Sequence, residues 1–309
     1  MDKRVLSQSG LAVVVAGIAT LAVAPGYSAN LVMWMAIAVL MAASLRFVLL
    51  IGELNFATAA FVGLGAYGAG VSTTILQWPF AVALLLSGVV AAAIGFVFGF
   101  VTLKTKGPYF LLIGFAFTEM VRLVYTKVQW LGGNSGMVGI FPPQYLEASY
   151  ITFVVVLVGV LLIALYAIEQ SHLGKCFVAI RDNDQVVQSV GVNVHLTKVA
   201  CLCIGAFAAG IAGGLSAFVN NVISPGDFGF LLSTFALAYL KVGGEDSPLG
   251  PVAGAILLVL LGSVALGLGA GEHVFYGLAI ILSVLLLPQG VVGLLSRLRP
   301  GRRSQAHVA

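Results

Sequence analysis

The chain has 309 residues, of which 60% are apolar and only 8% are charged, and its formal net charge is +4. Its mean hydropathy is +1.09, and a soluble globule cannot cover that much apolar surface with polar groups. The composition argues against a soluble enzyme, a nucleic-acid-binding protein and a disordered scaffold. It predicts an all-α, polytopic integral membrane protein.

A membrane-spanning helix needs about 20 mainly apolar residues to cross about 30 Å of hydrocarbon. We predict about ten such helices in one transmembrane domain over 1–309. In chain order they are 5–25, 30–50, 54–76, 80–103, 108–126, 150–169, 197–219, 228–243, 251–270 and 273–288. The glycine-rich third stretch and the eighth, of 16 residues, are the two candidates for broken or re-entrant helices.

The first stretch also resembles a secretory signal. Lys3 and Arg4 precede an apolar run that ends in the small residues of 22–24. Pro25 follows directly and disfavours cleavage after them. We expect an uncleaved first span, with a removed signal peptide as the alternative.

The Lys and Arg residues indicate the orientation, because they concentrate on the cytoplasmic side of membrane proteins. With ten passes and both termini inside, two of them, Arg122 and Lys127, lie outside and thirteen lie inside. The inner ones are Lys3, Arg4, Arg46, Lys104, Lys106, Lys175, Arg181, Lys198, Lys241, Arg297, Arg299, Arg302 and Arg303. The bias predicts cytoplasmic termini, a cytoplasmic segment at 171–195, an outer segment at 127–149 and a basic cytoplasmic tail at 296–309.

Two short stretches of the sequence echo each other. Residues 110–116 and 230–236 share five identities in seven positions. In the ten-pass arrangement the first stretch runs from inside to outside and the second from outside to inside. This is the arrangement of an inverted-topology repeat, which flanks the pathway in many transporters. Chance is the alternative, since Phe, Leu and Ala are abundant throughout the chain.

The cytoplasmic segment 171–193 is long for so compact a protein, and such insertions are usually functional or disordered. Phe177 and Ile180 indicate short amphipathic helical turns rather than disorder, with Asp182 as a cap and Gly191 as the end. Its Lys and Arg content is too modest for a helix that lies on lipid. We therefore expect it to dock into a partner protein.

Short sequence motifs, which occur in the same order as in a known family, support this interpretation. The run from Gly174 to Lys198, with Ala179-Ile180-Arg181-Asp182-Asn183 and Gly191-Val192-Asn193, resembles the ATPase-contacting loop of branched-chain amino-acid ABC-importer permeases, M-type subunit. Further similar pieces are Gly52 with Ala59-Ala60-Phe61 and Gly65-Ala66-Tyr67, then Gly107-Pro108-Tyr109-Phe110, Gly132-Gly133-Asn134-Ser135-Gly136-Met137, Gly243-Gly244 with Leu249-Gly250-Pro251 and Gly254-Ala255, and Pro288-Gln289-Gly290. The resemblance covers residues 50–295. The chain departs from the family pattern at Glu53, Asn55, 186–187 and 245–246.

The resemblance implies a permease subunit of the bacterial inner membrane that translocates branched-chain or related amino acids. It implies a second homologous permease subunit, two ATPase subunits that carry ATP and Mg²⁺, and a periplasmic solute-binding protein as partners, with membrane lipid around them and no nucleic acid. The ATPase-coupling residues would be Gly174, Lys175, Ala179, Ile180, Arg181, Asp182 and Gly191.

Polar residues within predicted spans are candidates for the solute pathway, because they are costly in lipid. Glu53 lies just before the third stretch. It is interpreted as a pathway residue, and the alternative is that it is simply a carboxylate at the membrane boundary. Asn55, Thr58 and Tyr67 lie among Gly and Ala, a composition suited to unwound backbone beside a cavity or to tight helix packing.

Glu119 completes the predicted pathway residues. It stands three residues before Arg122 on the fifth stretch, so that the two side chains can pair across one helix face. Arg122 lies near the outer end and is interpreted as a structural anchor.

The chain has no sequence of the form Gly-x-x-x-x-Gly-Lys-Ser/Thr, so it cannot hold nucleotide phosphates as a P-loop does. It has no His and Cys residues at metal-ligand spacing, and Cys201 and Cys203 are interpreted as small buried residues. We expect no bound cofactor, no metal and no enzymatic activity in this chain.

Two alternatives to the branched-chain function stay open at this point. A permease of the same family could carry urea, short amides or aromatic acids, because pore residues report the solute poorly. An ion-coupled secondary transporter would use Glu53 or Glu119 as a proton carrier.

Overall fold

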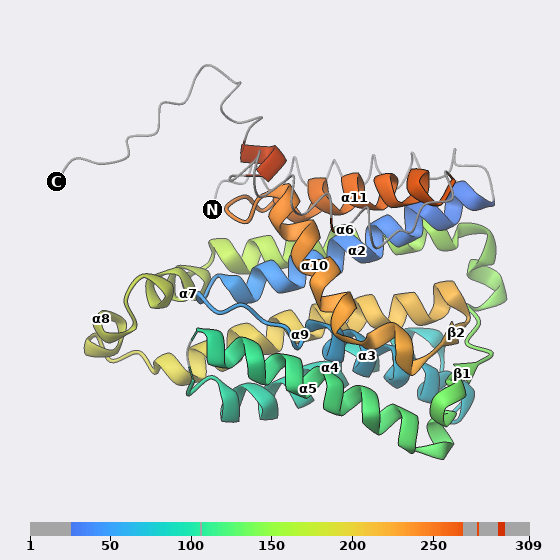
Figure 1. Cartoon of the computed structure of the whole chain (residues 1–309), viewed down its shortest axis with the longest axis horizontal. Helices are drawn as coiled ribbons and strands as arrows, with labels where there is room; N and C mark the ends of the chain where they lie inside the picture. The colour runs from blue at the N-terminus through green and yellow to red at the C-terminus, as the bar shows by residue number, and fades with distance from the viewer. Residues whose placement is uncertain (1–25, 106, 268–276, 278–289, 294–309) are drawn as a thin grey trace.

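The computed structural model of the chain describes residues 26–105, 107–267, 277 and 290–293. Its long helices run roughly side by side along one direction (Figure 1). The predicted spans 5–25 and 273–288, and the predicted basic tail 296–309, lie outside the described residues, apart from residue 277. The total of ten spans therefore stays a prediction.

A helix occupies each of the eight predicted spans that fall within the described residues. They are α2 (Tyr27–Leu49), α3 (Thr58–Thr74), α4 (Phe80–Thr102), α5 (Pro108–Lys127), α6 (Tyr150–Gln170), α9 (Val194–Asn220), α10 (Phe230–Gly243) and α11 (Gly250–Gly267). Among the described helices, α2, α4, α5, α6 and α9 are long and apolar enough to cross a membrane. The fold is an all-α, multi-pass membrane protein, as the composition predicts.

Shorter elements mark the two ends of the bundle. The helices α7 (His172–Asp182) and α8 (Asp184–Ser189) project from one end, which we call the α7–α8 end (Figure 1). At the β1–β2 end, the strands β1 (Met137–Val138) and β2 (Val222–Ile223) pair antiparallel, with Met137 opposite Ile223. The 3-10 turns η1 (Gln129–Leu131), η2 (Gly133–Ser135), η3 (Gln144–Ser149) and η4 (Pro225–Phe228) surround this pair in the sequence.

Local sequence explains where several helices begin and end. The backbone at Gly107 has a φ of +62°, and Pro108 then begins α5, where its fixed φ suits the first helical turn. The side chain of Asn193 accepts a hydrogen bond from the Leu196 amide at 3.1 Å and caps α9. Asn221, with a φ of +59°, ends α9 in the left-handed conformation.

The helix α9 is the centre of the described bundle, and it packs against α2, α3 and α4. Small residues on α9 allow backbone to approach backbone. A Cβ atom added to Gly213 would overlap the carbonyl oxygen of Val62 on α3, and one added to Gly210 would lie 2.5 Å from the carbonyl oxygen of Ser87 on α4. Membrane helices pack closely through such residues, which accounts for glycine at these two positions.

Both helices that the sequence marks as broken follow a stretch without α-helix. Residues 50–57 precede α3, which has 17 residues and begins four residues later than predicted. Residues 221–229 precede α10, which has 14 residues. The helix α5 begins at the α7–α8 end and α10 ends there (Figure 1). Their opposite directions are those that an inverted repeat requires, although the repeat itself stays a prediction.

Candidate translocation and coupling site

The segment 50–57, which we call the broken segment, is largely buried although it has no regular secondary structure. Buried backbone polar groups need partners inside the protein. The Asn55 Oδ1 atom accepts a hydrogen bond from the Ala57 amide at 3.0 Å, and the Thr58 hydroxyl donates to the Asn55 carbonyl at 3.0 Å. Both predicted pathway residues are thus buried and hold the start of α3 in this structure.

The carbonyl oxygen of Phe56 is the meeting point of three elements. It accepts hydrogen bonds from the Thr118 hydroxyl of α5 at 2.9 Å and from the Ser233 hydroxyl of α10 at 2.8 Å. The Ser233 oxygen in turn accepts from the Ala59 amide at 3.0 Å. Ser233 therefore caps α3 from another helix and ties the broken segment to α10.

Glu53 forms a buried ion pair at the α7–α8 end. Its Oε1 atom lies 3.3 Å from the Lys198 ammonium of α9, and Oε2 accepts from the Gly107 amide at 3.0 Å. The side chains of Glu53 and Lys198 are 5% and 6% exposed. The carboxylate thus connects the broken segment to α9 and to the turn between α4 and α5.

Tyr67 packs among aromatic rings further along α3. Its ring stacks on Tyr125 of α5 with centroids 4.0 Å apart and contacts Phe228 edge-on at 6.0 Å. The hydroxyl oxygens of Tyr67 and Tyr125 are buried and have no hydrogen-bond partner among the described residues. Two polar atoms are therefore held within an otherwise apolar contact between α3 and α5.

Glu119 and Arg122 form the ion pair that their spacing predicts. The Arg122 Nε atom donates to Glu119 Oε2 at 2.7 Å, and their side chains are 34% and 29% exposed. The Phe230 amide, at the start of α10, lies 3.3 Å from Glu119 Oε1 and donates to it. The carboxylate therefore also caps α10, where a negative charge is favourable.

The helices α7 and α8 carry the predicted coupling residues on one projecting unit. Phe177 and Ile180 of α7 are buried, as amphipathic turns require, and the Phe177 ring meets Phe47 of α2 edge-on at 5.9 Å. Gly191 ends the unit with a φ of +89°. The cap of α8 is Asn183 rather than Asp182, because its Oδ1 atom accepts from the amides of both Gln185 and Val186.

The outer surface of this unit combines charge with exposed apolar groups. Lys175, Ala179, Arg181 and Asp182 are exposed. Val186 and Val190 are 58% and 78% exposed, and no residue of α8 is buried. Exposed apolar side chains beside charges at the end of a membrane bundle suit a protein partner.

Two further contacts join α7 to the rest of the bundle. A Cβ atom added to Gly52 would lie 3.0 Å from the Arg181 Cγ atom, so the stem of Arg181 covers the broken segment. A Cβ atom added to Gly174 would overlap the Glu169 carbonyl oxygen at the end of α6. Gly174 therefore allows α7 to turn tightly against α6, and Arg181 reaches the broken segment directly.

Arg46 connects α2 to two other elements at the same end. Its two terminal nitrogens each donate to a carboxylate oxygen of Glu169 at 2.8 Å, and its Nε atom donates to the Glu245 carbonyl at 3.1 Å. Such a two-point contact fixes direction as well as distance. Arg46 thus holds α2, the end of α6 and the loop after α10 together.

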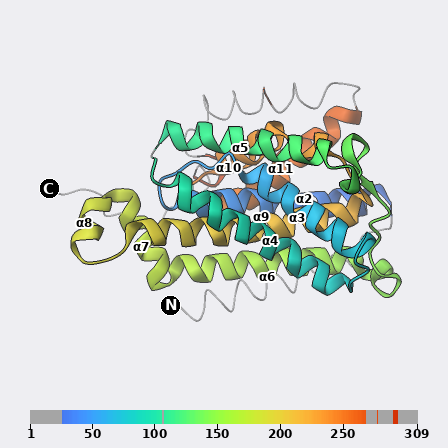
Figure 2. The ribbon, with the colours of Figure 1, turned by 90° about the horizontal axis from the view of Figure 1, so that it is seen from below.

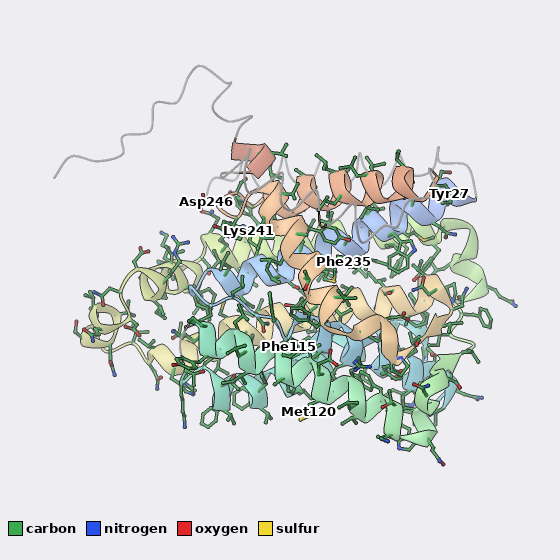
Figure 3. The ribbon with its side chains drawn as sticks, viewed as in Figure 1. Tyr27, Phe115, Met120, Phe235, Lys241 and Asp246 are labelled. Carbon is green, nitrogen blue, oxygen red and sulfur yellow. The ribbon has the colours of Figure 1, made fainter. Side chains whose placement is uncertain are left out.

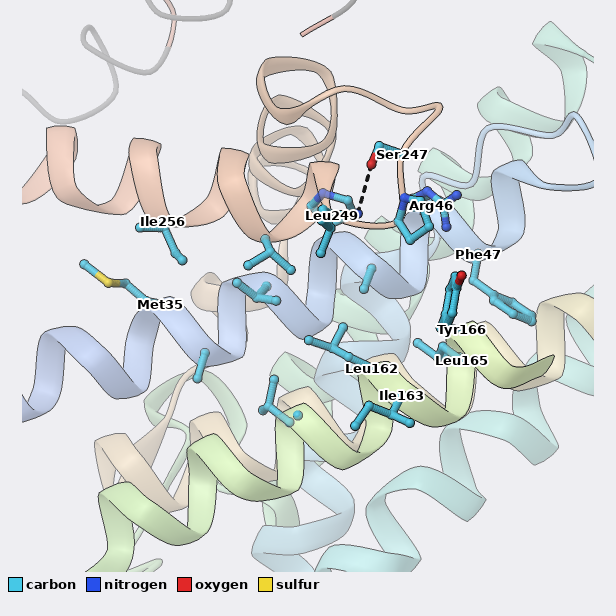
Figure 4. A pocket seen from close by; sticks show the side chains of 18 of the residues that line it. Met35, Arg46, Phe47, Leu162, Ile163, Leu165, Tyr166, Ser247, Leu249 and Ile256 are labelled. Atoms are coloured by element: carbon cyan, nitrogen blue, oxygen red, sulfur yellow. Dashed lines mark hydrogen bonds between the residues drawn. The ribbon is translucent and has the colours of Figure 1, made fainter. Parts of the chain in front are cut away.

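Two cavities lie among the described helices. The first, of about 790 Å³, lies among α2, α6 and α11 beside Arg46 and is otherwise lined mostly by apolar side chains (Figure 4). The second, of about 730 Å³, lies among α2, α9, α10 and α11, and Asn30, Ser216 and Asp227 are polar groups in its wall. The predicted pathway residues line neither cavity; their role in transport stays a prediction.

Sequence reasoning missed the residues whose partners are far away in the chain. Ser233, Thr118 and Lys198 satisfy the broken segment from 177, 62 and 145 residues away. A polar residue inside an apolar span was the available signal for Ser233 and Thr118. Arg46 and Glu169 each stand near the end of a predicted span. A charged residue is common there and does not indicate a functional contact.

The family follows from residues 27–287, which match the family described as branched-chain amino acid transport system / permease component. The chain belongs to this permease family. The match includes the broken segment, the α7–α8 unit and α10, so all the contacts described above lie within the matched residues.

Named relatives agree with the family. The chain is 27% identical over 271 residues to the high-affinity branched-chain amino acid transport system permease protein LivM of Escherichia coli (strain K12), and it is equally similar to LivM of Salmonella typhimurium. Each match covers 78% of this chain and 64% of the relative. A probable branched-chain amino acid transport permease protein LivH of Methanocaldococcus jannaschii is 30% identical over 153 residues, which are 46% of this chain and 47% of that protein. No solved structure matches the permease.

Proposed function

We propose that the chain is a permease subunit of an ABC importer that moves branched-chain or related amino acids across the bacterial inner membrane. The α7–α8 unit carries this proposal. It presents exposed charged and apolar side chains outside the bundle, and it also contacts the broken segment through Arg181. A soluble partner that binds there can act on the membrane helices.

The energy source in this proposal is ATP on separate subunits. The chain lacks the P-loop sequence that would cradle nucleotide phosphates. ATP and Mg²⁺ would be held by two ATPase subunits, which would bind the α7–α8 units of two permease subunits. A periplasmic solute-binding protein would deliver the solute at the β1–β2 end.

Movement of α7 would reach the membrane helices by two routes. One route runs from Arg181 over Gly52 into the broken segment, whose Phe56 carbonyl is bound to Thr118 and Ser233. The other runs from α7 through the end of α6 at Glu169 to Arg46 on α2. ATPase closure would shift the balance between two arrangements of these helices by contacting one of them better than the other.

The proposed orientation places the α7–α8 end in the cytoplasm. Among the described Lys and Arg residues, Arg46, Lys104, Lys175, Arg181, Lys198 and Lys241 belong to segments at that end, while Arg122 and Lys127 belong to the other half of α5. Lys241 and Asp246 lie near the α7–α8 end and Tyr27 lies at the opposite end (Figure 3). This distribution supports cytoplasmic termini under the positive-inside rule.

The solute pathway in this proposal passes the broken segment. Glu53, Asn55 and Thr58 are bonded to the protein itself in this arrangement. Opening a path along α3 would exchange those bonds for bonds to water or to a zwitterionic solute. Tyr67 and Glu119 would then contribute polar groups further toward the β1–β2 end.

The ion-coupled alternative is less well supported. A proton carrier must exchange its proton with water, whereas an ion pair with a basic side chain occupies the carboxylate oxygens. Glu53 is paired with Lys198 and Glu119 with Arg122. Both candidate carriers thus have a basic partner within 3.3 Å.

Uptake in cells tests the proposed solute class. A strain that lacks this chain would be supplied with labelled leucine, isoleucine, valine, phenylalanine or urea, with and without the restored gene. We expect restoration of leucine, isoleucine and valine uptake. Restoration of urea or phenylalanine uptake alone would contradict the branched-chain assignment and favour the alternative solutes.

A further inference from the structure

The helices α5 and α6 lie at opposite edges of the described bundle (Figure 2). Both are largely uncovered by the other described residues: 28% and 22% of the residues in their apolar windows are buried, against 78% for α9. The two edges differ in chemistry, because α6 is the most apolar of the five long helices and α5 the least. An exposed α6 suits lipid, whereas an exposed α5 needs another explanation.

The uncovered side of α5 carries charge at membrane depth. Leu112, Phe115, Glu119, Arg122 and Leu123 recur at helical spacing and form one side of α5, which we call the α5 stripe. Glu119 stands eight residues before the end of α5 at Lys127, and a helix rises about 1.5 Å per residue. Glu119 is thus about 12 Å and Arg122 about 8 Å inside the end of the helix, and lipid contact is costly for these partly exposed charges.

The start of α10 lies beside the stripe and also follows exposed polar groups. The Phe230 ring packs edge-on against Phe115 at 4.8 Å, and its amide donates to Glu119. Just before it, Gly226 and Asp227 of the short 3-10 turn η4 are exposed. Irregular backbone at membrane depth occurs beside protein or water and not beside lipid.

We propose that the α5 stripe and the start of α10 form the surface on which a second permease subunit of this same fold packs. The inference rests on the proposed function, which requires two permease subunits. A surface that holds an acid and a base side by side is complementary to its own two-fold copy, since each Glu119 can face the Arg122 position of the other subunit. Around the pair, Leu112, Phe115 and Leu123 are 59%, 39% and 52% exposed and supply apolar contact.

Photo-crosslinking in the assembled transporter tests this surface. Single probes of p-benzoylphenylalanine would be placed at Phe115 and at Leu123, and matched control probes at Val156 and Val160 on the exposed side of α6, which are 36% and 52% exposed. Irradiation of membranes that contain the whole transporter would be followed by mass spectrometry. We expect adducts to the second permease subunit from 115 and 123, and lipid adducts alone from 156 and 160.

Other results overturn the assignment. Permease adducts from the α6 probes, equal adducts from both helices, or lipid adducts alone from 115 and 123 would each show that the α5 stripe is not the subunit interface. Co-purification separates this failure from failure of the proposed function. If the ATPases and a second permease still co-purify with each probe variant, only the interface is wrong; if they never co-purify with the wild-type chain, the importer assignment is wrong.

Discussion

The buried ion pair between Glu53 and Lys198 leads to a prediction with a defined magnitude. Replacement Lys198→Met removes the ammonium 3.3 Å from Glu53 Oε1 and leaves a carboxylate that is 5% exposed. Removing one partner of a buried pair typically costs about 3–5 kcal/mol, because the remaining charge is desolvated and uncompensated. We expect that loss in the free energy of unfolding, measured by titration of the purified permease with a denaturing detergent.

The double replacement Glu53→Gln with Lys198→Met should recover most of this loss. The amide oxygen of Gln can still accept the Gly107 hydrogen bond that Glu53 accepts at 3.0 Å, so the remaining cost should be about 1 kcal/mol. The exposed pair Lys241–Glu245, whose side chains are 43% and 39% exposed, is the matched control. Lys241→Met should cost about 0–1 kcal/mol.

The reasoning is refuted if Lys198→Met is as stable as the wild type, or if the double variant is less stable than Lys198→Met alone. Either result would mean that the two groups do not face each other as a charged, desolvated pair. It would also remove the connection between the broken segment and α9.

Four further predictions concern packing, coupling, orientation and the pathway. Gly213→Ala should cost about 1–3 kcal/mol by overpacking α9 against α3, whereas Gly68→Ala should cost far less because its nearest neighbour would be 3.6 Å away; similar detergent-denaturation curves would contradict the close approach. Arg181→Glu should leave the amount of permease in the membrane normal but lose the ATPases, and co-purification of the full ATPase complement would refute its docking role. A single cysteine at Asn183, after removal of the three native cysteines, should react with an impermeant thiol reagent only from the cytoplasmic side; labelling of intact cells from outside would reverse the topology. Thr58→Leu should slow uptake without changing the affinity of the solute-binding protein for its solute, and normal uptake would show that Thr58 is only part of the scaffold.

The sequence predicted helix positions well where composition alone decides them. The bounds of α4, α5 and α6 differ from the predicted spans by one residue or less at each end, because Pro79, Pro108 and an apolar run with clear limits mark them. The Glu119–Arg122 pair was also predictable, since a spacing of three residues places both side chains on one face. Cys201 is buried as expected, but Cys203 was also expected to be buried and is only partly so; the three described cysteines are free.

Features that depend on distant parts of the chain could not be predicted in this way. The start of α3 was predicted at 54 and lies at Thr58, because Ser233 and Thr118 satisfy the Phe56 carbonyl and stabilise a non-helical approach. Nothing local indicates that Glu53 meets Lys198 or that Arg46 meets Glu169, which are 145 and 123 residues apart. Patterns in the sequence report spacing along one helix, whereas these contacts depend on how helices pack.

Uptake into proteoliposomes tests the central claim most directly. Vesicles would contain the purified permease with its partner permease and both ATPases, with the solute-binding protein and labelled leucine on the other side of the membrane. The account predicts leucine uptake that requires ATP, that stops when the ATPases are omitted, and that persists with an ionophore present. Uptake driven by an ion gradient without ATP or the ATPases would contradict it.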